Sequence, residues 1–228
     1  MEDIRVWCEV CGVPERVEGL IEQRNAVAIA YIEYRGMKRA GMRRLQQSFV
    51  GLWQQTSQFS IYEPLVIPGV FQTEAYARAI LSAVIEMGRL PDDLDAAVEV
   101  RIGRQSVLDG TRAFSVVLEE QALYTRFGSG EVMAEQLERL LAVGRMPGVS
   151  VGVISATAVR DPAWPVNGFW IYDGRTVITE IPTAQITVTH GPDVETFSRL
   201  FSGLTRMART GAAAEAMIGT AIGVHRQK

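Results

Sequence analysis

Residues 169–181 read FWIYDGRTVITEI, and this stretch sets the class of fold. Segments 169–172 and 177–181 are rich in aromatic and β-branched residues, which are typical of strands. The tripeptide DGR between them is a turn sequence. Two strands joined by so short a turn predict an antiparallel hairpin, which favours an antiparallel or mixed sheet over a doubly wound parallel one.

Apolar periodicity extends this pattern along the chain. Alternation predicts four further strands, and spacings of three and four residues predict helices around them. We therefore expect an α+β fold in which N-terminal helices pack on a small antiparallel or mixed sheet with C-terminal helices. The other predicted strands are 59–62, 114–118, 149–153 and 186–189, and the predicted helices are 4–11, 14–37, 42–53, 73–88, 91–108, 129–144, 192–207 and 212–223.

The composition is that of an ordinary globular protein with a slightly acidic charge. The chain has 228 residues, of which 47% are hydrophobic and 21% charged, and its formal net charge is -3. Such a chain folds as one medium domain or as a compact body with a small appendage. The negative charge gives no overall attraction for a phosphate backbone, which argues against a protein that binds DNA with its whole surface.

Neither a membrane span nor a secretory signal is expected from the sequence. The longest uncharged stretch, residues 45–62, is interrupted by glutamines, and the N-terminus has no basic start followed by an apolar run. The cytoplasm is therefore the expected location, with no membrane partner.

No motif for a metal ion or a cofactor is found. Cys8 and Cys11 lack the strand–helix–strand context of a redox pair, so we expect small buried side chains on one helical face. His190 and His225 lie far from these thiols and in no metal-ligand spacing. Glycine-rich nucleotide loops are also missing. We expect neither a metal nor a cofactor.

One basic stripe occurs near the end of the first helical region. Arg35, Arg39 and Arg43 recur every four residues, which would place them on one face of a helix. Such a face could contact phosphates. The alternative, which is the more common one for a run of charges, is the solvated side of a helix.

Aromatic and acidic residues gather around residues 53–63 and 164–180, and they could line one pocket. Aromatic rings give broad apolar walls, and a carboxylate beside them would orient a cationic or hydroxylated ligand. The alternative is that they are core residues with one wet edge. The predicted ligand-binding residues are Tyr62, Glu63, Trp164, Trp170 and Glu180, with Arg101 and Arg104 as partners for an anion, and no catalytic residue is assigned.

Glu119 and Glu120 end a predicted strand side by side. Neighbouring residues of a strand point to opposite faces, so at most one of the two faces inward. An inward carboxyl could serve as a general acid or base, and the alternative is that it caps the segment that follows.

Residues 61–78, IYEPLVIPGVFQTEAYAR, carry a specific resemblance. The chain resembles the uncharacterised C-terminal domain that follows an XRE-type helix-turn-helix in many regulators of high-GC Gram-positive bacteria. Position 155 is a serine here, where the family commonly has a proline. This difference lies where the chain leaves the predicted strand 149–153. The resemblance covers essentially the whole chain and continues through residues 99–105, 114–123, 136–140, 147–154 and 168–173.

The resemblance also implies a division of the chain. Residues 3–12 look like the last helix of the DNA-binding domain, and the recognition helix that should precede it is absent. We therefore expect residues 1–40 to be a remnant of the helix-turn-helix end with a connecting helix, and residues 41–228 to be a ligand- or partner-binding α+β domain. Such a chain would be a cytoplasmic regulatory domain with a small-molecule ligand, or a homodimer, and would bind no specific DNA alone.

A second hypothesis is a free-standing family member repurposed as a cofactor-free enzyme. A cyclase, lyase or isomerase could hold a small metabolite in the aromatic and acidic cluster and move a proton through Glu63 or Glu180. A third is a pure interaction module. The sequence contains no catalytic triad or metal set that would favour the enzyme.

Overall fold

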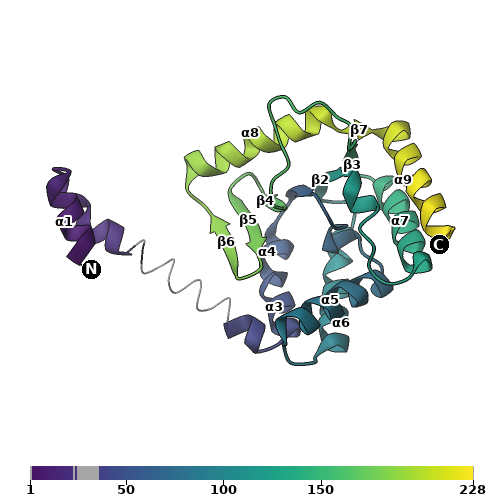
Figure 1. The fold of residues 1–228 in the computed structure, drawn as a ribbon, viewed down its shortest axis with the longest axis horizontal. Helices are drawn as coiled ribbons and strands as arrows, with labels where there is room; N and C mark the ends of the chain where they lie inside the picture. The colour runs from purple at the N-terminus through teal and green to yellow at the C-terminus, as the bar shows by residue number, and fades with distance from the viewer. Residues whose placement is uncertain (1, 23, 25–35, 228) are drawn as a thin grey trace.

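The computed structural model describes residues 2–22, 24 and 36–227. Most of the second half of the helix predicted at 14–37, and Arg35 of the basic stripe, lie outside the described residues. The fold is α+β, as predicted, and its centre is a seven-stranded sheet in the order β6-β5-β4-β1-β2-β3-β7 (Figure 1). The strands are β1 (Gln58–Glu63), β2 (Ala113–Glu119), β3 (Val149–Ile154), β4 (Phe169–Tyr172), β5 (Thr176–Ile181), β6 (Ala184–Val188) and β7 (Arg209–Thr210).

The sheet is mixed because two kinds of connection build it. β1, β2 and β3 pair in parallel, and helices form the crossovers between them: α5 (Glu74–Gly88) and α6 (Leu94–Gly103), then α7 (Gly130–Gly144). β4 and β5 form the predicted hairpin, with Tyr172 opposite Thr176 at the turn. β4 also pairs antiparallel with β1, and the two-residue β7, which alternation did not predict, pairs with β3.

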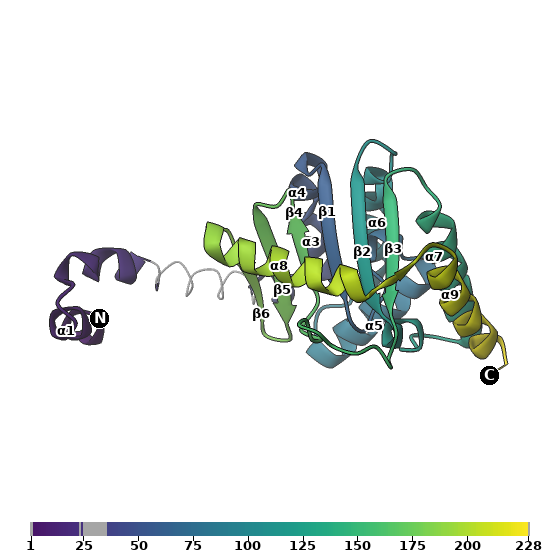
Figure 2. The same ribbon diagram turned by 90° about the horizontal axis from the view of Figure 1, so that it is seen from above.

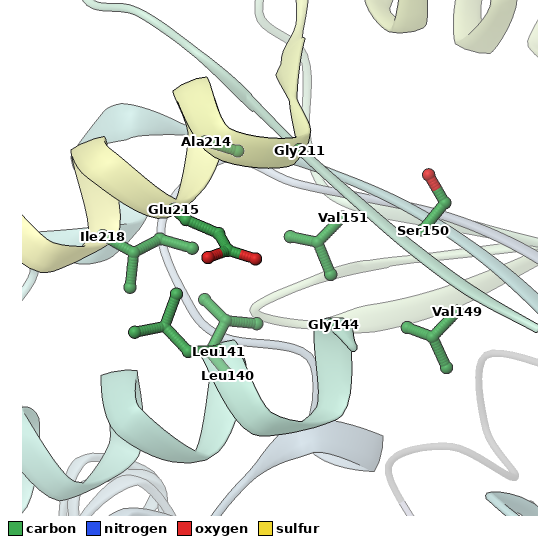
Figure 3. A pocket seen from close by; sticks show the side chains of 10 residues that line it. All are labelled: Leu140, Leu141, Gly144, Val149, Ser150, Val151, Gly211, Ala214, Glu215 and Ile218. Atoms are coloured by element: carbon green, nitrogen blue, oxygen red, sulfur yellow. The ribbon is translucent and has the colours of Figure 1, made fainter. Parts of the chain in front are cut away.

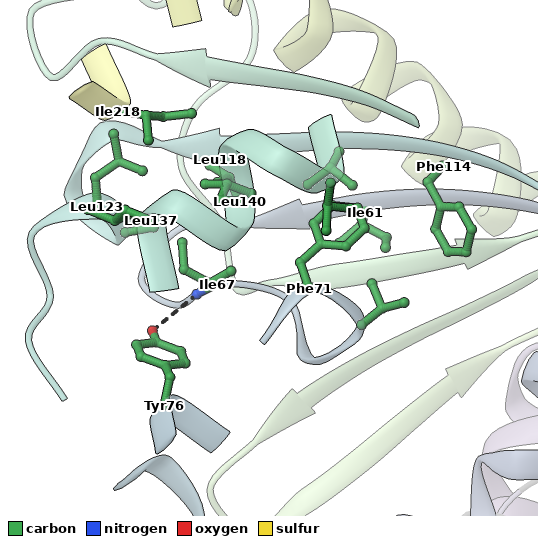
Figure 4. Close-up of a cluster of buried hydrophobic side chains, with 14 of the residues drawn as sticks. Ile61, Ile67, Phe71, Tyr76, Phe114, Leu118, Leu123, Leu137, Leu140 and Ile218 are labelled. Atoms are coloured by element: carbon green, nitrogen blue, oxygen red, sulfur yellow. Dashed lines mark hydrogen bonds between the residues drawn. The ribbon is translucent and has the colours of Figure 1, made fainter. Parts of the chain in front are cut away.

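Helices cover both faces of the sheet. Helix α8 (Gly191–Met207) crosses the strands on one face (Figure 2) and packs over Tyr62, Phe169 and Ile171. The other face carries the larger core. Figure 4 shows part of it, where α7 and α9 (Gly211–Arg226) meet the strands and the Tyr76 hydroxyl accepts a hydrogen bond from the backbone N–H of Ile67 at 3.3 Å.

Local capping explains where several helices begin. The hydroxyls of Thr73 and Ser129, the first residues of the helices predicted at 73–88 and 129–144, accept backbone N–H groups in the first turns of α5 and α7. Helix α3 (Met42–Ser48) is capped from a distance instead, because the Asp93 carboxylate accepts the N–H groups of Met42 and Arg43 at 3.0 and 2.8 Å.

This distant cap also interrupts the predicted basic stripe. Gly41 precedes α3 with φ 106°, a conformation that suits glycine, and a Cβ there would collide with the Asp93 carboxylate. Arg39 and Arg43 therefore lie in two helical segments that Ala40 and Gly41 separate, and not on one continuous helix. The expectation of one helical face from Arg35 to Arg43 is wrong for the part that is described.

Other elements differ from the predictions in detail. The helix expected at 42–53 is two helices, α3 and α4 (Val50–Gln55), and the one expected at 91–108 is α6 followed by a 3-10 turn, η3 (Arg104–Val107). In α1 (Glu2–Val10), Cys8 is buried, but Cys11 lies beyond the helix and is exposed, so the expectation of two buried thiols is wrong for Cys11. The remaining short 3-10 turns are η1 (Pro14–Arg16), η2 (Gly69–Phe71) and η4 (Glu120–Leu123).

Across the described parts of the chain, no helix combines the length and the apolar character needed to cross a membrane.

Candidate functional site

The principal cavity lies between helices α3 to α6 and one face of strands β1, β4 and β5. Its volume is about 640 Å³, which is within the usual size of a small-molecule site. Its walls are mainly aliphatic and come from elements far apart in the sequence. The aliphatic lining residues are Met42, Leu45, Leu65, Val66, Ile67, Ile80, Leu81, Val84, Met87, Ile178 and Ile181.

Five of the seven residues predicted to bind a ligand line this cavity: Glu63, Arg101, Arg104, Trp170 and Glu180. Three of them lie on strands, and the alternation of side chains along a strand explains why all three point into the cavity. Glu63 ends the row of β1 that points to the helical side, Trp170 occupies that row on β4, and Glu180 follows Ile178 on β5. Their common location is a geometric result, and their role in binding stays a prediction.

Tyr62 does not line the cavity. It precedes Glu63 on β1, so its side chain points to the opposite face of the sheet, under α8. There its hydroxyl donates to Glu119 Oε1 at 2.8 Å, and Arg160 Nη1 donates to the same oxygen at 2.8 Å. The expectation that Tyr62 and Glu63 form one wall is wrong, and the period of a strand is the reason.

Trp164 does not line the cavity either. It lies in the connection between β3 and β4 and is 64% exposed, among residues outside regular secondary structure. Glu119 is buried and Glu120 is half-buried, which agrees with the expectation that at most one of this pair faces inward. The Glu120 carboxylate accepts from the backbone N–H of Ala156 at 2.7 Å.

Arg101 and Arg104 are joined through Gln46 at the α3 side of the cavity. Arg101 Nε donates to Gln46 Oε1 at 3.1 Å, and Arg104 Nη2 donates to the same oxygen. Arg101 Nη1 donates to Gln72 Oε1 at 3.0 Å. Burial, followed by the neighbouring charge of Arg101, lowers the pKa of Arg104 to about 9. Burial likewise lowers the pKa of Arg101.

Aromatic rings form a layered wall beside these cations. Trp53 stacks on Trp170, with ring centroids 5.1 Å apart, and Trp170 stacks on Tyr172 at 6.2 Å. The Arg104 guanidinium carbon lies 4.4 Å from the Trp53 ring centroid, within the range of a cation–π contact. These three rings give the cavity an aromatic wall beside its cations.

The pKa of Glu63 is well above the ordinary value for a carboxyl group. Trp170 Nε1 donates to Glu63 Oε1 at 2.8 Å, and Gly168 allows this carboxylate to lie against the chain, because a Cβ at Gly168 would meet Glu63 Oε2 at 2.5 Å. Burial raises the pKa of Glu63 to about 7, and the charge of Glu180 adds to the rise. Glu180 is exposed at the cavity, but surrounding protein still raises its pKa through desolvation.

Sequence reasoning missed four polar residues of the cavity: Lys38, Gln46, Gln72 and Thr179. Lys38 Nζ donates to the carbonyl oxygen of Pro182 at 3.1 Å, which joins two lining segments that are 144 residues apart. Gln46 could have been found, because it is a polar residue on the apolar face that Met42 and Leu45 form. A fully buried amide on such a face needs partners, and here the partners are the two arginines.

A smaller cavity of about 220 Å³ lies between α7, α9 and β3 (Figure 3). Leu140, Leu141 and Ile218 line it, and its one acidic residue, Glu215, pairs with Arg145 at 2.7 Å on the surface. In the described residues no three His, Cys, Asp or Glu side chains are grouped so that they could hold a metal ion.

Comparison with known protein families gives a match over most of the chain. A family described as "Domain of unknown function (DUF5753)" matches residues 46–220, which include most of the cavity lining and the whole sheet. None of the curated proteins matches the chain.

Proposed function

Because this chain belongs to the DUF5753 family, whose name records no function, we propose a role from the cavity itself: the protein is a regulatory domain that binds a small molecule. The observation that carries this proposal is an aliphatic cavity of about 640 Å³ with a few charged groups inside it. Ligand sites of proteins have this composition, in which apolar walls supply affinity and convergent polar groups supply orientation.

The position of Lys38 supports a regulatory role. This residue lies in the short helical segment before Gly41, and it reaches the rim of the cavity through its bond to Pro182. A ligand in the cavity would therefore contact the segment that leads to the N-terminal part of the chain. Such a contact can bias that segment between two arrangements, provided the ligand binds them with different affinity.

We also propose that the domain is related to XRE-type regulators and does not read specific DNA by itself. The net charge of -3 and the interruption of the basic stripe at Gly41 support this view. In an electrophoretic shift at low salt, we expect weak binding that disappears as salt rises. Tight, salt-resistant binding to one operator would contradict it.

Cavity binding can be tested with a neutral fluorescent probe, N-phenyl-naphthylamine. We expect saturable binding by the wild type and loss of at least about tenfold in affinity in Val84→Trp, because the indole would occupy space at the cavity wall. Ser82→Trp is the matched control, since Ser82 is exposed on the same helix, α5. Equal affinity of the wild type and Val84→Trp would overturn the proposal.

Hydrogen exchange tests the link to the N-terminal segment. When the probe binds, we expect slower exchange of backbone amides in residues 36–48, because α3 and Lys38 line the cavity. Lys38→Met should reduce the slowing in residues 36–40 and leave that in α3. Unchanged exchange throughout 36–48 with the probe bound would show that the cavity does not communicate with this segment.

The cofactor-free enzyme remains a second candidate, and Glu63 is the observation that favours it. A carboxyl group with a pKa of about 7 in a cavity can act as a general acid or base near neutral pH. Mass spectrometry of a bound metabolite after incubation separates the candidates. Recovery of the unchanged metabolite supports binding, whereas a product formed by the wild type but not by Glu63→Gln supports catalysis.

A further inference from the structure

Two guanidinium groups in the cavity, that of the buried Arg104 and that of the half-buried Arg101, share one neutral acceptor. Arg101 and Arg104 both donate to Oε1 of Gln46, so their positive charges lie close together. Among the residues that the structure describes, no carboxylate oxygen lies within 4.0 Å of either guanidinium. The two charges repel each other, and the proximity of Arg101 contributes to the lowered pKa of Arg104.

Two buried N–H donors beside the cavity, one on Arg104 and one on Trp53, also lack a hydrogen-bond acceptor among the described residues. Arg104 is 8% exposed, yet its Nε has no acceptor in the described structure. The Nε1 of Trp53 is likewise buried without an acceptor in hydrogen-bond geometry, although the Tyr172 hydroxyl is close enough to interact with it. Buried charges and donors without partners are unfavourable. An anion in the cavity would relieve both the repulsion and the missing hydrogen bonds.

We propose that the ligand of this cavity is an organic acid, with an apolar body against the aliphatic and aromatic walls and one anionic group bound by Arg101 and Arg104. This inference rests on the proposed function and adds the ligand's chemical class. A guanidinium group binds a carboxylate or sulfonate through two parallel N–H donors, which makes an arginine pair a specific anion site. Gln46 and Gln72 hold Arg101 in place, so they are positioning residues for the anion.

The two carboxyl groups of the cavity, Glu63 and Glu180, do not cancel its preference for an anionic ligand. Glu63 accepts a hydrogen bond from Trp170, and at neutral pH a substantial fraction of it is protonated. Burial raises the pKa of Glu180, while the charges of Arg101, then Lys38 and Arg104, favour its ionised form. The three cations that line the cavity, Lys38, Arg101 and Arg104, still outnumber its two carboxyl groups.

Two probes that differ by one anionic group test the proposal. Anilinonaphthalene sulfonate has the rings of N-phenyl-naphthylamine with a sulfonate added. We expect the sulfonate probe to bind the wild type at least about tenfold more tightly, with one site that Val84→Trp blocks. If the neutral probe binds and the sulfonate gives no advantage, the organic-acid proposal is wrong and the cavity proposal stands. If neither probe binds, both are wrong.

Arg101→Met identifies the group responsible. We expect this variant to lose at least about tenfold in affinity for the sulfonate probe and less than about twofold for the neutral probe. Arg101→Lys should fall between, because it keeps the charge and loses the paired donors. Arg44→Met is the control, since Arg44 is exposed on α3 outside the cavity lining. An equal loss for both probes in Arg101→Met would overturn the proposal, and Arg101→Lys gives the same comparison if Arg101→Met does not fold.

The change of sulfonate-probe affinity with pH is a second, independent test. The groups that face Glu63 are Glu180 from β5, Arg101 from α6, Trp170 from β4 and Tyr76 from α5. Since the sulfonate stays ionised, its affinity should fall severalfold from about pH 6 to about pH 8, as Glu63 ionises and repels it. Glu63→Gln should remove this fall. Sulfonate affinity that rises with pH in the wild type would contradict anion binding at this site.

Discussion

Glu63→Gln is expected to stabilise the protein at pH 8 by about 2–3 kcal/mol and to have an effect below about 1 kcal/mol at pH 5. Burial raises the pKa of Glu63 from 4.5 to about 7. Between these two values the unfolded chain has released the proton and the folded chain still holds it. The free energy of unfolding therefore falls as pH rises through this window, and above it Glu63 must be ionised inside the cavity.

Glutamine removes this penalty and keeps an oxygen that can accept from Trp170 Nε1. The magnitude is set below the full value for the shift because Glu63 is half-buried and not fully enclosed. Urea denaturation at several pH values measures the difference between the two proteins. Glu180 is present in both, so the difference reports Glu63 together with its repulsion by Glu180.

Glu86→Gln provides the control for this experiment. Glu86 is exposed on α5, and its neutralisation should change stability by no more than about 0.5 kcal/mol at either pH. A stability difference between wild type and Glu63→Gln that does not grow with pH would show that Glu63 titrates like an ordinary surface carboxyl.

Glu119→Ala is expected to destabilise the protein by about 2–4 kcal/mol, the other large effect. The Glu119 side chain is 8% exposed, and it accepts hydrogen bonds from both nitrogens of the Arg160 fork and from the Tyr62 hydroxyl. Its removal leaves Arg160 without its ion pair and Tyr62 without its acceptor. Arg160 is 24% exposed, so water recovers part of the loss.

The double variant Glu119→Ala/Arg160→Ala tests whether the unpaired charge is the cause. We expect it to be less destabilised than the sum of the two single variants, because no buried charge is left without a partner. Tyr62→Phe should lose about 1–2 kcal/mol, since only one hydrogen bond is removed. Midpoints of urea denaturation with an unchanged slope measure these effects, and additive losses would contradict a coupled cluster.

Tyr62 and Glu63 are neighbours on β1, but their side chains lie on opposite faces of the sheet. Tyr62 serves the packing of α8 against the sheet, while its neighbour Glu63 serves the cavity on the opposite face. Substitutions at Tyr62 should therefore change stability and leave probe affinity nearly unchanged. Neighbouring side chains of a strand point to opposite faces, which separates the two residues.

Much of the architecture could be predicted because it depends on neighbours in the sequence. Alternation located four of the strands, and the composition of 169–172 and 177–181 with the turn at 173–175 predicted the hairpin of β4 and β5. Thr73 and Ser129 marked helix starts because a hydroxyl at that position satisfies backbone N–H groups nearby. Five of the residues that meet in the cavity could be named because charged and aromatic side chains are conspicuous in apolar surroundings.

Other features follow from contacts between distant residues. The Asp93 carboxylate that caps α3 lies 51 residues from Met42, and it separates Arg39 from Arg43 where a single helix was expected. β7 is a strand only because β3 offers it a partner. No local pattern reports such pairings, since their free energy comes from groups that meet after the chain has folded.

The amino-acid sequence by itself determined the α+β class, the hairpin, the acidic net charge and which chemical groups were available for a site. The tertiary structure alone decided that β1, β2 and β3 run parallel, that Tyr62 and Trp164 lie away from the cavity, and that Gln46 lies between Arg101 and Arg104. The physical reason is range: periodicity, turns and caps act over a few residues, whereas two arginines that share one buried amide exist only where packing brings remote segments together.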